Sequence, residues 1–158
     1  MIETRKNVAK RRPAEVFAMI NELKTMYDEY AKKSLEVRKK APVFAGILGL
    51  GSDPRKHPCH EEFYDATIAW TERFAAAQPS AEEAMEVARF LLETPPAYRD
   101  YDSYWFMYVA VGNIRTLIPL LSKEDCKALV KRFDELYRKQ DRMPLQVETY
   151  KKLVKAAK

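Results

Sequence analysis

One long apolar stretch, residues 101–121 with the sequence YDSYWFMYVAVGNIRTLIPLL, constrains the fold more than any other part of the chain. Beyond Ser103, the only charged residue in it is Arg115. Apolar side chains recur at the spacing of one continuous helix seam: Tyr104, Met107, Val111, Ile114 and Ile118. A helix that is apolar on all sides is normally surrounded by other helices. We therefore predict a central helix over about 101–118, which Pro119 ends or kinks.

The same stretch must also be weighed as a membrane span. Its most apolar part, residues 104–121, is about as long as the shortest helices that cross a bilayer. It contains Asn113, Arg115, Thr116 and a proline, and an arginine in the middle of a membrane costs at least ~2.5 kcal/mol. No other segment of the sequence is comparably apolar. The sequence therefore predicts no membrane span.

Arg115 has two interpretations. A buried guanidinium needs a carboxylate or an anionic ligand. One expectation is an ion pair with Asp or Glu on a neighbouring helix, or a head group that reaches solvent. The other is a ligand site in which Arg115 is the counter-ion of a bound anion beside Tyr101, Trp105 and Tyr108. Tyrosine and tryptophan suit the wall of a ligand cleft, but they suit ordinary packing between helices equally well.

The composition fits a helical protein of one domain. The chain has 158 residues but only four glycines, and no segment has the alternating pattern of a strand. Connections after Ala77 are short, which favours antiparallel neighbours. We predict an all-α fold with a single domain over residues 1–158, a bundle of five or six helices around the helix at 101–118. Residues 1–11, which are polar and basic, are expected to form a frayed lead-in.

Local start and stop signals place the other helices. Pro13 suits a first helical turn, Ser80–Glu83 is a capping-box pattern, and Ser122–Asp125 is a weaker version of it. The predicted helices are residues 13–39, residues 58–77, one from Ser80 that stops before Pro95, one from Ser122 to near Gln140, and one from Pro144. The last of these is predicted to bury Leu145, Val147, Tyr150, Leu153 and Val154.

The segment His57-Pro58-Cys59-His60 is the chemically densest part of the chain, with both histidines and one of the two cysteines. Glu61 follows directly, and all these side-chain types except proline bind metals. We therefore expect a divalent-metal site here as one alternative, in which Asp53 or Glu61 completes the set of local ligands and Cys126 supplies a ligand from elsewhere in the chain. A second alternative makes Cys59 a reactive thiol at a helix N-terminus. The third is structural: His57 caps the helix, Cys59 fills a buried gap, and His60 bonds to a backbone group or a carboxylate.

Charge is distributed unevenly along the chain. The formal net charge is +5, and residues 1–40 hold 11 Lys and Arg against 6 Asp and Glu, whereas residues 41–158 hold 17 of each. Such asymmetry can mark an acidic partner, an RNA or a membrane surface, but a solvated helix face explains it equally well. No motif of a known nucleic-acid-binding fold is present, so nucleic acid is the third-ranked partner.

These observations predict a non-enzymatic helical interaction module that binds a protein partner or itself. The sequence has no complete catalytic motif, and its predicted first helix is long and charged, which suits an interaction surface. The alternative is a small-molecule or metal-binding protein, with or without catalysis, that combines His57, Cys59, His60 and Glu61 with the aromatic wall around Arg115. Two cysteines and the absence of an apolar leader at the N-terminus predict a cytoplasmic location with free thiols.

Overall fold

The computed structural model of the chain describes residues 2–40, 57–93 and 112–158, with side chains from residue 14 onward. Within these ranges the chain forms helices and no strand, so the predicted all-α bundle is confirmed. Residues 112–117 are also helical. The elements with full bounds are α1 (Ile2–Lys40), α3 (Pro58–Ala76), α4 (Ala81–Glu93), the 3-10 helix η3 (Ile118–Leu120), α6 (Lys123–Leu136), the 3-10 helix η4 (Lys139–Asp141) and α7 (Pro144–Ala157).

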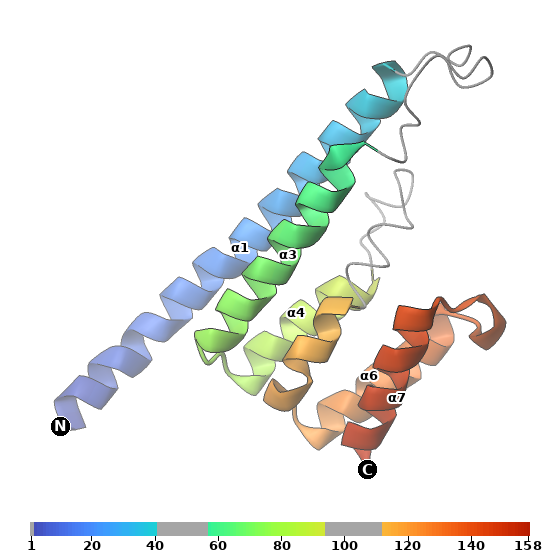
Figure 1. The fold of residues 1–158 in the computed structure, drawn as a ribbon. Coiled ribbons are helices and arrows are strands. Elements are labelled where there is room, and N and C mark those ends of the chain that lie inside the picture. Colours follow the sequence, from blue (N-terminus) through green and yellow to red (C-terminus); the bar gives the residue numbers. More distant parts are fainter. Residues whose placement is uncertain (1, 41–56, 94–111) are drawn as a thin grey trace, which may run out of the picture.

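Helices α1 and α3 lie antiparallel along one another (Figure 1). Near the α3 N-terminus the rings of Tyr30 and Phe63 stack at 4.0 Å between centroids. Near its C-terminus the Trp70 indole Nε1 donates to the Met19 carbonyl at 2.9 Å. Periodic residues of both helices are buried as predicted: Val16, Ile20, Leu23, Tyr27, Tyr30 and Ser34 on α1, and Phe63, Thr67, Trp70 and Phe74 on α3. The apolar periodicity therefore determines which faces of the two helices meet.

The predicted start of the first helix at Pro13 is wrong, because α1 already begins at Ile2. Proline removes one backbone donor from a helix interior, but the residues on both sides of Pro13 are alanine, arginine, lysine and glutamate, which favour helix. Figure 1 shows that the N-terminal part of α1 extends beyond the end of α3. The first turns of α1 thus lie outside the helical pair.

Helix α4 begins at the predicted capping box. Glu83 N–H donates to Ser80 Oγ at 3.1 Å, and Ser80 N–H donates to the Glu83 carboxylate at 2.8 Å. Such a box satisfies two backbone donors that the first helical turn leaves without partners. The predicted inward residues are all buried: Met85, Val87, Ala88, Leu91 and Leu92. An edge-to-face contact between Tyr27 and Phe90, with centroids 5.0 Å apart, joins α4 to α1.

Only the end of the predicted central helix falls within the described part of the chain. Residues 101–111 lie outside it, so their place at the centre of the bundle stays a prediction. Ile114 and Leu117 are fully buried, and the α-helix ends at Leu117, where η3 (Ile118–Leu120) begins around Pro119, in agreement with the predicted end. A Cβ atom on Gly112 would lie 3.0 Å from Leu145 Cδ2, so glycine allows this segment to approach α7 closely.

Helix α6 also begins at a capping box, between Ser122 and Asp125, but the prediction that it continues to near Gln140 is wrong. The α-helix ends at Leu136, and Tyr137 is extended. Arg142 explains the early end, because its Nε and Nη2 both donate to the Tyr137 carbonyl, at 3.1 and 2.8 Å. The sequence has no local signal for a contact of this kind.

The Arg142 side chain is only 4% exposed and joins α6 to α7. Its guanidinium lies between two rings, 4.8 Å from the Phe133 centroid and 4.4 Å from the Tyr150 centroid. It donates to Asp134 at 2.9 Å, and Tyr150 donates to the same carboxylate at 3.0 Å. The hydrogen bond from Arg142 lowers the pKa of Asp134. Burial is the main reason that the pKa of Tyr150 is raised, and its hydrogen bond to Asp134 raises it further. Nearly every polar group of this cluster therefore has a partner.

The buried face of α7 differs from the predicted one. Val147 is 37% exposed, whereas Gln146 and Thr149 are buried beside the expected Leu153. The Gln146 carbonyl oxygen accepts from Met143 N–H at 2.9 Å, so this polar side chain closes the first turn of the helix. The predicted burial of Val147 is therefore wrong, since helix geometry and capping at this position override hydrophobicity.

Candidate functional site

Among the residues that the structure describes, two cavities form a groove between α4 and α6. The N-terminal residues of both helices line one cavity, of about 550 Å³, and residues further along both helices line a second, of about 380 Å³. The two helices therefore run in the same direction. Met85 and Arg89 border both cavities, which makes the groove continuous. We call this surface the α4–α6 groove.

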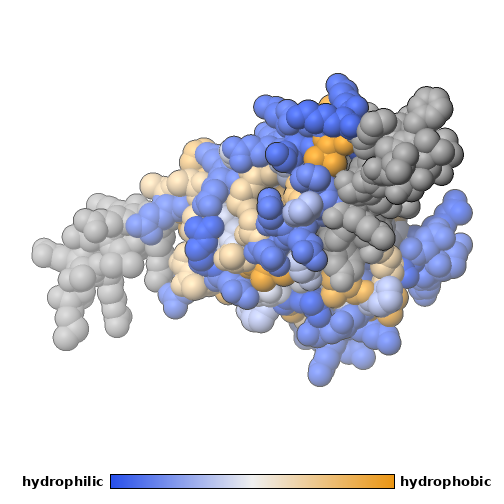
Figure 2. Space-filling model, turned by 45° about the horizontal axis from the view of Figure 1, so that its top comes forward, coloured by the Kyte–Doolittle hydropathy of each residue, from blue (hydrophilic) through white to orange (hydrophobic). Residues whose placement is uncertain are grey.

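The groove has an apolar floor between charged walls. Met85, Leu92 and Leu129 are each at most 5% exposed, so they present only small apolar areas at the base. On the face of the molecule in Figure 2, hydrophilic and hydrophobic residues are mixed. A groove with an apolar floor and charged walls suits recognition that combines charge with a few apolar contacts.

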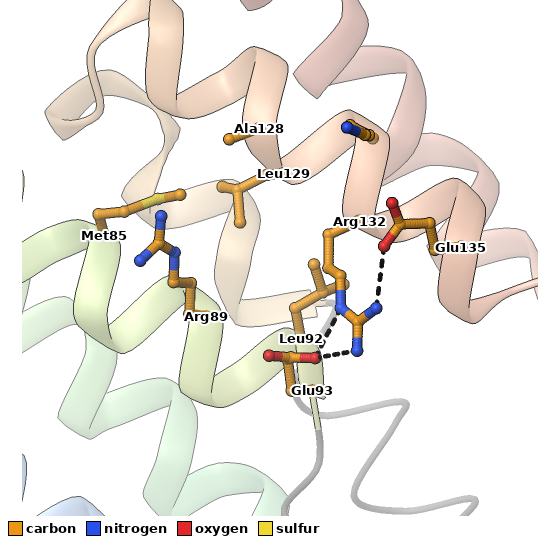
Figure 3. Close-up of a pocket in the computed structure, with 9 residues that line it drawn as sticks. Met85, Arg89, Leu92, Glu93, Ala128, Leu129, Arg132 and Glu135 are labelled. Carbon is orange, nitrogen blue, oxygen red and sulfur yellow. Dashed lines mark hydrogen bonds and ion pairs between the residues drawn. The ribbon is translucent and has the colours of Figure 1, made fainter.

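One arginine of the groove is held by two carboxylates. Arg132 Nε donates to Glu93 at 2.7 Å, and its Nη1 donates to Glu135 at 2.9 Å (Figure 3). The hydrogen bonds that Arg132 donates to Glu135 and Glu93 raise its pKa above the ordinary value. Because Glu93 is on α4, this pair also links α4 to α6. The charge of Arg132 is thus largely neutralised within the protein.

Arg89 is in a different state. Figure 3 shows its side chain directed into the space between α4 and α6, close to Met85 and Leu129. Among the residues that the structure describes, no carboxylate forms an ion pair with Arg89, and none does so with the neighbouring Lys131. Two cations without an internal counter-ion in one cavity favour an anionic group from outside the chain.

The other end of the groove is acidic. Glu82, Glu86 and Asp125 border the larger cavity. Asp125 is occupied in the α6 capping box, where it accepts from Ser122 N–H at 3.4 Å. Glu82 and Glu86 are exposed on α4. The groove therefore has a negative end near the helix N-termini and a positive centre at Arg89 and Lys131.

The predicted metal residues have other partners or point to solvent. His57 is the N-cap of α3, and its Nδ1 accepts from Cys59 N–H at 3.1 Å. His60 is buried with its Nδ1 2.5 Å from the Tyr30 hydroxyl, and Glu61 is exposed. Within the described ranges no three His, Cys, Asp or Glu side chains gather closely enough to hold a metal ion. Asp53 lies outside those ranges, and metal binding by this segment stays a prediction.

For this segment the structural alternative is confirmed at His57 and Cys59. His57 caps the helix and Cys59 is 5% exposed, as expected, and His60 bonds to the Tyr30 hydroxyl. Cys59 borders a shallow cavity of about 340 Å³ beside Tyr30 and Lys33. Cys126, the proposed distant ligand, is buried on α6, and burial raises the pKa of its thiol. Both thiols are free.

The predicted ligand site around Arg115 is only partly described. Arg115 donates to the α7 residue Glu148 at 3.0 Å and to the Gly112 carbonyl at 3.4 Å, and its side chain is 31% exposed. The expectation of an ion pair with a neighbouring helix is therefore confirmed. The remaining residues of the predicted site, Tyr101, Trp105 and Tyr108, lie outside the described residues.

Sequence reasoning missed the residues of the α4–α6 groove. Arg89, Lys131 and Arg132 look like ordinary polar positions on amphipathic helices, and no motif distinguishes them. Their significance depends on the parallel direction of two helices that are separated along the chain. The single local hint is that Arg89 immediately follows the buried Val87 and Ala88, which places it at the edge of the α4 apolar face.

Comparison with known proteins gives no match: no family model fits the chain, and no curated protein or solved structure is recognisably similar to it. In the described part of the chain, no helix is both long and apolar enough to cross a membrane. Any function must therefore be argued from the geometry.

Proposed function

We propose that the protein is a non-enzymatic interaction module that binds a segment of a partner protein in the α4–α6 groove. The observation that carries this proposal is Arg89, a cation that is directed into an open groove and has no ion-pair partner among the described residues. Arginine and lysine together form charge-assisted hydrogen bonds with carboxylates, and these are stronger than neutral hydrogen bonds. The cationic centre therefore favours an Asp or Glu side chain of the partner.

The rest of the groove indicates two further features of the partner segment. The buried Met85 and Leu129 at its base offer a contact for one apolar side chain next to the acidic one. The exposed Glu82 and Glu86 favour a basic residue toward the N-terminal end of α4. A peptide with basic, apolar and acidic residues in this order along the groove matches the surface. Two free cysteines suit a reducing compartment, so a cytoplasmic location forms part of the proposal.

A peptide library displayed on phage tests the proposal without a known partner. Peptides selected on the wild-type protein are expected to share an Asp or Glu, and their affinities are measured by fluorescence polarisation. Arg89→Glu should weaken them by about tenfold or more, since it replaces attraction by repulsion at the same place. Arg38→Glu, the same change at an exposed α1 residue away from the groove, should leave the affinities unchanged.

A charge swap then separates recognition at Arg89 from an indirect effect. Changing the acidic residue of a selected peptide to Lys should weaken binding to the wild type and restore part of the binding to Arg89→Glu. The proposal is wrong if the selected peptides bind Arg89→Glu as tightly as the wild type, or if the library yields no binding peptide.

A further inference from the structure

The two walls of the α4–α6 groove carry the same pattern of side chains. The α4 residues that line the groove are spaced as one continuous stripe of a helix: Glu82, Met85, Glu86 and Arg89. The α6 residues with the same spacing that line it are Asp125, Ala128, Leu129 and Arg132. Because the two helices run in the same direction, each wall starts with a carboxylate, continues with a buried apolar residue and ends with an arginine.

The backbone of these walls favours a helix as the occupant of the groove. Both walls are α-helical, and the middle of each helix uses its backbone N–H and C=O groups in its own hydrogen bonds. An extended peptide in the groove would therefore bury part of its backbone without hydrogen-bond partners, which is unfavourable. A helical peptide pairs its backbone groups internally and meets the groove with side chains alone.

The charges of the groove determine the direction of such a helix. Glu82 and Glu86 border the end near the helix N-termini, and they favour a basic residue of the occupant. Arg89 and Lys131 lie further along, have no ion-pair partner among the described residues, and favour an acidic one. Within a helix, acidic residues are stabilising near the N-terminus and basic residues near the C-terminus. A helix whose N-terminal end lies at Arg89 meets both conditions, and it runs antiparallel to α4 and α6.

We infer that the occupant of the α4–α6 groove is an amphipathic helix of the partner protein, antiparallel to α4 and α6; this inference rests on the proposed function. The inner face of the partner helix carries an acidic residue opposite Arg89. Apolar residues three and four positions later cover Met85 and Leu129, and a basic residue seven positions later lies opposite Glu82. Seven residues of helix span about 10 Å, which equals the length of α4 from Glu82 to Arg89.

The mixed charges of the groove disfavour two simpler occupants. A nucleic-acid backbone would be attracted to Arg89 and Lys131, but Glu82 and Glu86 would repel its phosphates in the same groove. An apolar helix without charges would gain little, because the floor residues are each at most 5% exposed, and it would remove water from the charged walls. A helix with one acidic and one basic residue on its inner face has neither disadvantage.

Peptides of about 18 residues, selected by phage display on the full chain, test the direction of the helix. Their acidic residue is expected seven positions before their basic residue. Exchanging these two residues should weaken binding to the wild type by about tenfold or more, and the exchanged peptide should bind Glu82→Arg/Arg89→Glu more tightly than the original peptide does. Glu36→Arg/Arg38→Glu, the same changes at exposed α1 residues away from the groove, should bind the original peptides as the wild type does.

A proline in the selected peptides tests whether they bind as helices. Placed five positions after the acidic residue, where a helical peptide faces solvent, proline should weaken binding by about tenfold or more, whereas alanine there should not. Peptides that depend on Arg89 but tolerate this proline, or that place the basic residue first, would overturn the antiparallel helix and leave the proposed function standing. If no peptide binds, or if none depends on Arg89, the proposed function itself is wrong and this inference is wrong with it.

Discussion

Arg142 and Arg89 are the same residue type in opposite circumstances. Arg142 lies between the rings of Phe133 and Tyr150, donates to Asp134 and to the Tyr137 carbonyl, and is almost entirely buried. Arg89 is exposed on α4, is directed into a groove, and has no ion-pair partner among the described residues. The comparison separates an arginine whose donors are used to hold α6 against α7 from one whose donors remain for a partner.

The largest expected effect is the loss of the Arg142 contacts. Arg142→Met should reduce the free energy of unfolding by about 2–3 kcal/mol, measured by urea denaturation. Methionine fills part of the space, but the Tyr137 carbonyl loses two charged donors and the two rings lose their cation. The ion pair with Asp134 adds little, since that carboxylate is 44% exposed.

Two further variants sharpen this result. Arg138→Met, the same change at an exposed neighbour, should have almost no effect on stability. Arg142→Lys should recover less than half of the loss, because an ammonium group cannot lie flat between two rings and bond the carbonyl twice. If Arg142→Met and Arg138→Met are equally stable, Arg142 does not hold the two helices together.

Asp134 provides a smaller, pH-dependent effect. Its folded-state pKa lies below the ordinary value of 3.8, chiefly because Arg142 donates to it. Its contribution to stability is therefore fully present above about pH 4 and is lost as the pH falls through the lower folded-state pKa. Asp134→Asn should be less stable than wild type by under about 1 kcal/mol at pH 6, since the carboxylate is partly exposed.

The difference between the two proteins should disappear in the acid range. Urea midpoints of wild type and Asp134→Asn, measured from pH 6 to pH 2, should converge as Asp134 of the wild type takes up a proton. A constant difference over that range would show that the asparagine disturbs packing and that the charge of Asp134 contributes nothing.

Sequence patterns predicted the parts of this fold that depend on neighbouring residues. The capping boxes at Ser80 and Ser122 and the buried faces of α1 and α3 are all local or periodic features, and they are found where expected. Arg115 was singled out because its sequence neighbours are apolar. The exposed fraction of the Arg115 side chain depends on how its helix packs against α7. Its ion pair with Glu148 joins residues that are 33 positions apart in the sequence.

The features that sequence patterns did not predict depend on distant contacts. Arg142 has charged neighbours in the sequence and resembles a loop residue, yet a ring from α6 and a ring from α7 bury it. The α4–α6 groove likewise depends on the register of two helices, and the contact between Arg132 and Glu93 crosses 39 residues. No periodicity or motif indicates contacts between such distant residues. The sequence alone therefore assigns no role to Arg142 or to Arg132.

Arg132 is intermediate between the two arginines of the comparison. It has two carboxylate partners, as a structural arginine does, but all three side chains are close to half exposed. Arg132→Met should therefore be less destabilising than Arg142→Met, and the difference from wild type should shrink at high salt because exposed ion pairs are screened. Urea midpoints of wild type and Arg132→Met, measured at low salt and at 1 M salt, give the stability difference and its dependence on salt. A stability difference that does not change with salt would instead indicate apolar packing by the arginine stem.

Arg89→Met should have the smallest effect on stability, within about 0.5 kcal/mol of wild type in the same urea experiment, since surface changes that break no contact rarely exceed this. Methionine favours helix about as well as arginine, so α4 itself should not be weakened. The same variant should lose most of the affinity for peptides selected on the α4–α6 groove. This combination, stability retained and binding lost, distinguishes an arginine held ready for a partner from a structural one. A loss of stability close to that of Arg142→Met would mean that Arg89 is already used within the fold, and the groove would then have no free cation to offer a partner.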